Sequence, residues 1–528
     1  MPTRSRPAFS LLLLALAAPL ALPAQTGSCG VGNARNWCAG QDSPGVVGVA
    51  QAGDRFGAAL AFGDFDGDGA TDLAVGAPGE SDGLAGNAGA VWAFHSSSLG
   101  LHLGGTQVFD QDDLSGGDGG TESDDQFGFA LAAGDIDGDG YDDLAIGSPF
   151  EDLPDEDGVC GILSDCEAAG VVHAVFGSPS GLDTTRVAFF RNSIAFEGQG
   201  TGHSLTIGNF DGDEDEELVV GMPGSMTAGD FTIDTSKVAI LTLSEAGVLV
   251  PAGVSGADPA LEEGAQWGFA VALGGLGPDG APGYASGAPS ATAGGSPAAG
   301  RVSVLDEDGA GLAELLQNDF GTAGNGASDA FGSALAVGHF DGDGFDDLAS
   351  AAPFKNDGGA TDSGRIYVAF GSSAGVDPAV FDILSLGDFP GTTAADGDRL
   401  GAALAAGDFD GDGFDDLFLG SPGRGGDDRG FVFYLRGSAE GLSAGVNFVL
   451  SEPTLGGTAQ ANAGFGSVLA MGDLDGDGAD ELGIGVPDKN SGADDSGIVY
   501  VTRQFNPNWI FGDGFESAGL AIWSDSSG

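Results

Sequence analysis

One unit of about 65 residues, repeated along most of the chain, limits what this sequence can fold into. The clearest copy is FGAALAFGDFDGDGATDLAVGAP at 56–78, and FGFALAAGDIDGDGYDDLAIGSP follows at 127–149. Weaker or later copies begin at Thr201, Trp267, Phe331, Leu400 and Phe465. Seven regularly spaced copies predict a repeat architecture, because a unit this short and rich in glycine cannot bury a core of its own.

Each copy reads as four short strands. The FG-x-A-L-A block predicts the first strand, and D-L-A-V-G-A-P predicts a second that its proline ends. A third strand follows a glycine, as in GAVWAF from Gly89, and a weaker fourth follows, such as TQVFD from Thr106. The period-two alternation of apolar residues indicates strands. We therefore predict an all-β fold, a seven-bladed β-propeller with four-stranded antiparallel blades. A row of separate small β-domains is the alternative.

The two ends of the repeat array suggest how such a ring closes. The first full repeat begins near Gly53, and VVGVA at 46–50 precedes it and looks like a fourth strand. The last copy ends near Val501 after only its third strand. We therefore expect residues 46–50 to complete the seventh blade, so that the propeller spans 46–505.

The turn between the first two strands of a good copy reads D-x-D-x-D-G-x-x-D. Side chains at positions 1, 3, 5 and 9 and the carbonyl of position 7 can converge on one point, and the glycine at position 6 permits the sharp reversal. Calcium takes six to eight hard oxygen ligands, so these hairpin loops are predicted calcium sites. An EF-hand is excluded, because its position 12 is a glutamate and Val75 stands there in the first loop.

Four loops carry complete ligand sets. In the first two copies these are Asp64, Asp66, Asp68 and Asp72 with the carbonyl of Ala70, and Asp135, Asp137, Asp139 and Asp143 with that of Tyr141. In the last two they are Asp408, Asp410, Asp412 and Asp416 with that of Phe414, and Asp473, Asp475, Asp477 and Glu481 with that of Ala479.

The other three loops depart from the pattern. In the fifth copy His339, a poor calcium ligand, replaces the first acid beside Asp341, Asp343 and Asp347 and the carbonyl of Phe345. In the third, Asn209, Asp211, Asp213 and Glu217 remain but Glu214 replaces the glycine, so occupancy stays open. The fourth retains only Asp279, and we predict no ion there. The expected total is about five to six Ca2+ ions.

The Phe-Gly start, the Asp-rich loop and the Gly-Ala-Pro end together resemble the integrin α-chain repeat known as FG-GAP. The resemblance covers roughly 46–505. It implies a seven-bladed propeller with calcium in hairpin loops on one face and partners on the opposite face and rim. Similar bacterial secreted proteins are often linked to adhesion. The fourth copy is degenerate, and we recognise no leg-like or membrane segment, so integrin anchoring and signalling do not carry over.

The net charge and a predicted targeting signal limit the partners and the compartment that this protein can have. Sixteen Lys and Arg residues against 79 Asp and Glu give a formal net charge of −63, which argues against nucleic-acid and anionic-membrane partners. Arg4 and Arg6, the apolar run at 11–22 and Pro23-Ala24 predict a signal peptide at 1–24. No later run of 18 apolar residues suggests a membrane span. We expect a secreted or cell-surface protein, with the periplasm as an alternative.

The cysteines and the segments outside the repeat fit export. We favour local disulfides, Cys29–Cys38 within the N-terminal segment 25–45 and Cys160–Cys166 within the acidic insertion 151–169. A zinc site is the alternative, although the spacings lack C-x-x-C knuckles. The insertion is a binding loop or a plain surface excursion. The tail at 506–528 resembles short aromatic DGFE-containing ends of secreted Gram-negative proteins, or is a closing strand.

The sequence offers no recognisable catalytic motif, neither H-E-x-x-H nor G-x-S-x-G, so we expect no enzyme. We interpret His173 and His203 as packing residues, and we favour core packing over sugar stacking for Trp92 and Trp267. The leading hypothesis is a monomeric, calcium-dependent extracellular binding or adhesion scaffold for an unknown protein or glycan. A structural matrix protein is the second, and an unrecognised hydrolase the third.

Overall fold

The computed structural model describes residues 36–502, apart from 84, 98–99, 116–119, 155–164, 193–197, 214, 229–230, 235, 245, 256–263, 307, 322–323 and 443–447. The predicted signal peptide and tail lie outside the described residues. Cys29 and Cys160 also lie outside them, so both disulfide pairings stay predictions.

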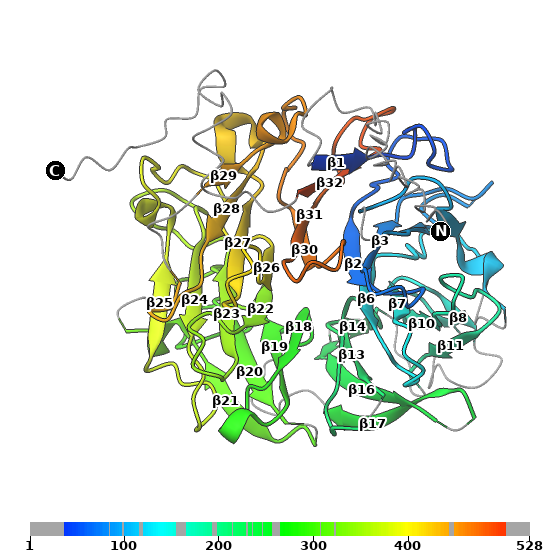
Figure 1. The fold of residues 1–528 in the computed structure, drawn as a ribbon. Helices are drawn as coiled ribbons and strands as arrows, with labels where there is room; N and C mark the ends of the chain where they lie inside the picture. The colour runs from blue at the N-terminus through cyan, green and yellow to red at the C-terminus, as the bar shows by residue number, and fades with distance from the viewer. Residues whose placement is uncertain are drawn as a thin grey trace, which may run out of the picture.

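Seven four-stranded antiparallel sheets surround a central axis, which confirms the predicted propeller (Figure 1). The first three blades contain β2 (Ala59–Gly63), β3 (Asp72–Ala77), β4 (Ala90–Phe94) and β5 (Gln107–Phe109); β6 (Ala130–Gly134), β7 (Asp143–Ser148), β10 (Val171–Val175) and β11 (Val187–Phe190); and β12 (Ser204–Gly208), β13 (Glu217–Met222), β16 (Lys237–Leu243) and β17 (Leu249–Ser255).

The fourth repeat forms a complete blade despite its degenerate loop. The last four blades contain β18 (Ala270–Gly274), β19 (Gly283–Ala288), β20 (Arg301–Leu305) and β21 (Gly311–Leu315); β22 (Leu335–Gly338), β23 (Asp347–Ala352), β24 (Arg365–Ala369) and β25 (Phe381–Leu384); β26 (Leu404–Gly407), β27 (Asp416–Ser421), β28 (Phe431–Leu435) and β29 (Val449–Leu450); and β30 (Val468–Gly472), β31 (Glu481–Val486), β32 (Ile498–Thr502) and β1 (Asn36–Ala39).

Two small hairpins project from the blades. In blade two, β8 (Leu153–Pro154) pairs with β9 (Asp165–Cys166) inside the predicted acidic insertion. In blade three, β14 (Ser225–Ala228) pairs with β15 (Phe231–Asp234), an addition that the repeat pattern does not predict.

The ring closes with an N-terminal strand, but the strand predicted at 46–50 is wrong. The outer strand of blade seven is β1, whose residues from Asn36 to Ala39 pair with β32 from Thr502 back to Val499 (Figure 1). Trp37 of β1 also packs edge-on against Phe94 of blade one, at 5.3 Å between ring centroids. Val47 and Val49 lie on a loop and are 61% and 69% exposed. Residues 46–50 have a higher strand propensity than Asn36–Ala39, but they lack the core contacts that select a strand.

Neighbouring blades are held together by backbone contacts at the repeated Phe-Gly pair. In five blades the glycine before the third strand forms a parallel bridge to the start of the next blade, as in Gly89 with Phe127 and, across the ring closure, Gly497 with Phe56. A Cβ atom on Gly89 would lie 2.1 Å from the carbonyl oxygen of Phe127. Glycine is required there because any side chain would push the blades apart.

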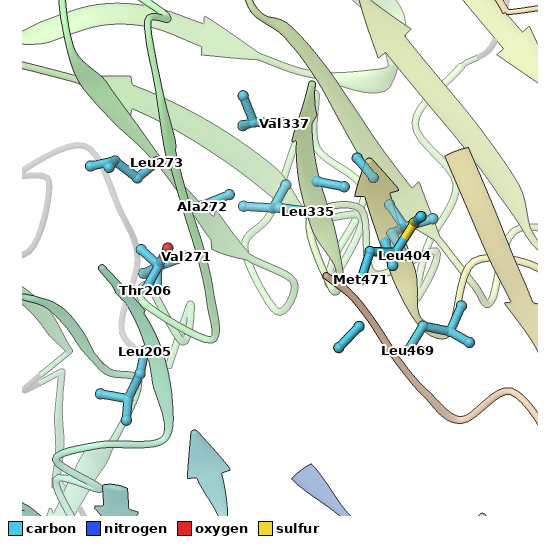
Figure 2. A pocket seen from close by; sticks show the side chains of 14 residues that line it. Leu205, Thr206, Val271, Ala272, Leu273, Leu335, Val337, Leu404, Leu469 and Met471 are labelled. Carbon is cyan, nitrogen blue, oxygen red and sulfur yellow. The ribbon is translucent and has the colours of Figure 1, made fainter. Parts of the chain in front are cut away.

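The second strand of every blade is buried at all six positions, since it lies between the two adjacent sheets. The first strands face the axis. Side chains from the first strands of blades three to seven line a cavity of about 290 Å3 (Figure 2). Leu205, Leu335, Leu404 and Leu469 contribute to a lining that is apolar except for Thr206. The described part of the chain contains no helix that is long and apolar enough to span a bilayer.

His173 of β10 is a core residue, as predicted. Its side chain is fully buried and packs on the ring of Phe127 at 5.7 Å between centroids. Neither ring nitrogen has a hydrogen-bond partner among the described residues. Burial therefore lowers the pKa of His173 to about 4, because the charged imidazolium would be desolvated.

The first prediction concerns acid stability. In the unfolded chain His173 takes up a proton near pH 6.5, whereas in the folded chain it does so only near pH 4. The free energy of unfolding is therefore highest above pH 6.5 and decreases as the pH falls towards 4. His173→Leu should remove that loss, which amounts to about 3 kcal/mol between pH 7 and pH 4. Urea unfolding of both proteins across this range measures the difference. Parallel pH profiles would contradict the assignment.

The second prediction concerns ring closure. Removing residues up to Ala39 should expose the edge of β32 and cause aggregation, because an unpaired strand edge templates further pairing. The matched control, Val47→Ser with Val49→Ser, changes two exposed loop residues and should stay within about 0.5 kcal/mol of the wild type. Light scattering and thermal melts distinguish the two variants. Equal behaviour would refute closure by β1.

Candidate metal centres

The predicted loops connect the first and second strands of each blade. Because every blade is a copy of the same meander around one axis, these hairpins lie on the same face of the ring. In the acidic loops, backbone N–H groups hold the acids in place.

The acid at position 1 caps its own loop. Asp64 accepts hydrogen bonds from the N–H groups of Asp68 (3.0 Å) and Gly69 (2.9 Å), one on each carboxylate oxygen. Asp135, Asp408 and Asp473 accept the same pair of bonds from positions 5 and 6 of their loops. The repeated aspartate thus shapes the turn in addition to supplying charge.

The acid at position 9 begins the second strand and is buried. Asp143 accepts from the N–H of Ile136 within its loop (2.9 Å) and from that of Gly177 beyond the third strand (2.8 Å). Burial raises the pKa of Asp143 to about 8 and those of Asp347, Asp416 and Glu217 to about 7. These carboxylates are costly to ionise without a cation nearby.

Several of the loops bring three acids together. The carboxylate oxygens of the following sets lie within 4.8 Å of one another: Asp64, Asp66 and Asp68; Asp135, Asp137 and Asp143; Asp211, Asp213 and Glu217; and Asp408, Asp410 and Asp416. The third loop converges although Asn209 replaces its first acid and donates to the carbonyl oxygen of Asp213 at 2.6 Å.

These donor sets fit a hard divalent cation. They offer oxygen atoms, which calcium prefers. Asp137 Oδ1 is buried and accepts no hydrogen bond from the described part of the chain. A cation held by these carboxylates would supply the partner that this oxygen lacks.

The fifth loop differs at its first position, where His339 is half exposed. Its Nε2 lies 2.9 Å from Asp346 Oδ1, so the imidazole is engaged by an acid outside the predicted ligand set. Asp341, Asp343 and Asp347 keep their places, and Phe340 N–H donates to Asp347 at 2.9 Å. The fourth loop contains a short 3-10 turn at Pro278–Gly280 in place of the acidic hairpin.

Comparison with known proteins places the repeats in a family. The FG-GAP repeat family matches residues 56–94, 127–161, 331–369 and 400–435, which lie in blades one, two, five and six. Integrin alpha-PS2 of Drosophila melanogaster is 31% identical over 176 residues, or 32% of this chain and 12% of its own length. This chain is an integrin α-like FG-GAP repeat protein.

Other relatives of the FG-GAP chain are equally partial. Integrin alpha-V of Gallus gallus is 28% identical over 223 residues, covering 41% of this chain and 20% of the integrin. A phosphatidylinositol-glycan-specific phospholipase D of Mus musculus is 35% identical over 161 residues, covering 30% and 18%. The alignments therefore span about a fifth or less of these curated relatives.

Among solved structures, the FG-GAP chain resembles a Bacillus licheniformis rhamnogalacturonan lyase at a TM-score of 0.40 and 12% identity, covering 88% of this chain and 74% of the lyase. A second rhamnogalacturonan lyase gives 0.42 and 14%, covering 84% and 71%. Likenesses at this level carry no argument about function.

Sequence reasoning missed the basic side chains that enter the FG-GAP loops. Arg436, directly after β28, contacts Asp410 (2.6 Å) and Asp412 (2.5 Å), and Arg186, directly before β11, contacts Asp137 and Asp139. His95 Nδ1 lies 3.0 Å from Asp72 Oδ2. Lys and Arg are scarce, 16 in 528 residues. This scarcity is the one sequence signal that could have drawn attention to a basic residue beside a third or fourth strand.

The acid at position 8 also has an unpredicted role, as a link between blades. Asp142 Oδ2 accepts the N–H of Asp64 in the preceding blade at 2.8 Å, and Asp480 Oδ2 accepts that of Asp408 at 2.9 Å. Glu216 and Asp415 make the same contact at 3.1 and 2.8 Å. Loop acids thus serve two purposes, and the position 8 acids join one FG-GAP loop to the next.

The remaining candidate residues pack inside the FG-GAP blades. His203 lies between Phe129 and Phe269, with ring centroids 5.1 and 4.8 Å away, which confirms its packing role. Trp267 is fully buried in the core. Trp92 is buried too, and its Nε1–H donates to the carbonyl oxygen of Val47 at 2.7 Å. Neither tryptophan presents a free ring face for stacking on a sugar.

The third prediction concerns competition between arginine and a metal ion. Arg436→Ala removes a positive charge beside Asp410 and Asp412, so calcium should bind the sixth loop about two- to tenfold more tightly. Arg429→Ala is the matched control, because Arg429 pairs with Asp427 outside the loop. Calorimetric titration of both variants with calcium reports the change. Weaker binding by the Arg436 variant would show that the guanidinium supports the site.

Proposed function

We propose that this protein is a secreted calcium-binding FG-GAP propeller that acts as an extracellular binding or adhesion scaffold. One observation carries the calcium assignment: matched acids converge at the same turn of several blades. An acidic turn that occurs once is an ordinary feature, whereas one kept in several blades of a ring points to a shared ligand.

Electrostatics supports calcium in these loops. Three carboxylates within 4.8 Å repel one another, and burial of the position 9 acid adds a desolvation cost. A divalent cation offsets both costs. Ordered loops would in turn give this face of the ring a fixed shape, which a binding surface needs.

We propose binding in preference to catalysis. His173 and His203 pack in the core, and the cavity on the axis is lined by leucine, valine, alanine and methionine side chains and one threonine, Thr206. The integrin alpha relatives favour an adhesive role for this chain. The phospholipase D relative is matched over 18% of its length, so its activity is a weaker guide.

We propose that the propeller is exported and works as a monomer. The predicted signal peptide at 1–24 and the predicted local disulfides suit an oxidising compartment. The net charge of −63 favours ligands that are neutral, cationic or bound through calcium. An unknown protein or glycan remains the proposed partner.

The fourth prediction tests calcium in the loops. Calcium should raise the melting temperature, since one site at a hundredfold excess over Kd adds about 2.7 kcal/mol. Asp66→Asn with Asp68→Asn should reduce the gain, because both acids belong to the first loop cluster. Differential scanning calorimetry with calcium and with a chelator measures it. A transition that a chelator leaves unchanged would overturn the calcium assignment.

The binding role is tested separately. Protein and glycan arrays should give calcium-dependent binding that the loop variant weakens. Turnover of a polymer substrate, abolished by a substitution outside the loops, would replace the scaffold with an enzyme.

A further inference from the structure

A buried junction lies where each blade begins, on the face opposite the acidic loops. The segment that enters the first strand meets the turn after the second strand there, because antiparallel strands place alternate connections at opposite ends of a sheet. In blade five this junction holds Lys355, whose Nζ lies 2.7 Å from Asp329 Oδ2 and 2.5 Å from the carbonyl oxygen of Gly324.

Blade six holds a cation at the same place. Arg424 and Asp398 are separated along the chain by the same number of residues as Lys355 and Asp329. Arg424 Nη1 lies 2.7 Å from Asp398 Oδ2 and 3.2 Å from the carbonyl oxygen of Thr393. One base and one acid balance the charge of each junction.

Blade seven reaches the same balance with a different acid. Lys489 has the corresponding position, and Ala463 replaces the aspartate. Lys489 Nζ instead lies 2.9 Å from Glu452 Oε1 and donates to the carbonyl oxygen of Thr458. Glu452 belongs to the short turn that follows the outer strand of blade six. The carboxylate can therefore come from either side of the junction, while the cation stays in place.

Blade one has two acids at this junction and no base among its described residues. Asp54 and Glu80 have the spacing of Asp329 and Lys355, so a carboxylate stands where the other blades carry an ammonium or guanidinium group. Gln41, which follows the outer strand of blade seven, corresponds to Glu452, and its Nε2 donates to Glu80 Oε2. Gln51 Nε2 lies 3.3 Å from Glu80 Oε1.

Two oxygens at this junction are buried without a donor among the described residues. Asp54 is fully buried and Gln41 is 1% exposed. Asp54 Oδ2 accepts the N–H of Gln51 at 2.5 Å, but Asp54 Oδ1 and Gln41 Oε1 accept no hydrogen bond from any described residue. Glu80 is held beside Asp54, since the N–H of Gly79 donates to the carbonyl oxygen of Asp54 at 3.1 Å. Leaving such groups unmatched is costly, so the site calls for a positive partner.

We propose that Asp54, Glu80 and the amide oxygen of Gln41 bind a calcium ion at the position where blades five to seven carry the cation of a Lys or Arg side chain. Two carboxylates carry the charge that a divalent ion neutralises, and carboxylate and amide oxygens are ligands that calcium prefers. In blades five to seven the cation also contacts a backbone carbonyl oxygen, that of Gly324, Thr393 or Thr458. Val49 has the corresponding position in the sequence of blade one.

Blade two repeats the pattern. Gln111, Asp125 and Glu151 stand at the positions of Gln41, Asp54 and Glu80, all three are buried, and Gln111 Nε2 donates to Glu151 Oε2 at 2.9 Å. The same three residue types at two junctions argue against a chance pairing of acids in blade one.

The fifth prediction uses Glu80→Lys, which gives blade one the cation of blade five. The full-length variant should bind one calcium ion fewer than the wild type by equilibrium dialysis. It should also melt at a higher temperature than the wild type in a chelator, because the ammonium replaces the ion. Asp66→Asn with Asp68→Asn is the control that removes a loop site and leaves the junction intact. An unchanged ion count with Glu80→Lys would overturn the proposal, since a shared proton would then hold the carboxylates together.

A second measurement does not depend on the variant folding. Wild-type crystals soaked in manganese chloride should show an anomalous peak between Asp54, Glu80 and Gln41. A peak there without peaks in the acidic loops would support this site and refute the loop sites, so the two proposals fail separately. Peaks in the loops alone would overturn the junction site.

Discussion

The close approach of neighbouring blades is the constraint on which the rest of this molecule depends. A Cβ atom added to Gly76, in the second strand of blade one, would lie 2.1 Å from the carbonyl oxygen of Gly128 in blade two. Gly147, Gly221, Gly287, Gly420 and Gly485 are equally close to a glycine of the next blade. These contacts set the spacing that lets Asp142 and Asp480 reach across to the loop of the preceding blade. The contacts between neighbouring acidic loops thus depend on the glycine packing between the sheets.

Both faces of the ring then meet the same electrostatic problem, which is how to hold buried carboxylates close together. Some blades use a protein cation, as Lys355 and Arg424 do on one face and Arg436 does on the other. Other blades place acids together without one among the described residues, at Asp54 with Glu80 and in the third loop at Asp211, Asp213 and Glu217. A repeat that varies only the charge of one side chain can therefore switch between an internal ion pair and a site for an external ion.

The sequence predicted the features that repeat and missed those that depend on contacts between repeats. The spacing of the copies was enough for seven blades, and the loop pattern was enough to bring Asp135, Asp137 and Asp143 together. The closing strand was misplaced because VVGVA has strand propensity, whereas the choice of Asn36–Ala39 rests on pairing with β32 and on Trp37 against Phe94. The position 8 acids and Arg186 could not be assigned, because no local pattern reveals the register between separate blades.

The pairing of β1 with β32 has a consequence for how the protein is made. The first strand of the ring can be paired only after the last blade has been synthesised, since Asn36 meets Thr502. Until then β1 has no strand to pair with, while six blades can already stack. Closure joins residues of the highest sequence separation in the ring, so this contact carries the largest loop-closure entropy cost. A chain cut short during synthesis or export would therefore carry a nearly complete ring with one open strand edge, a form prone to aggregation.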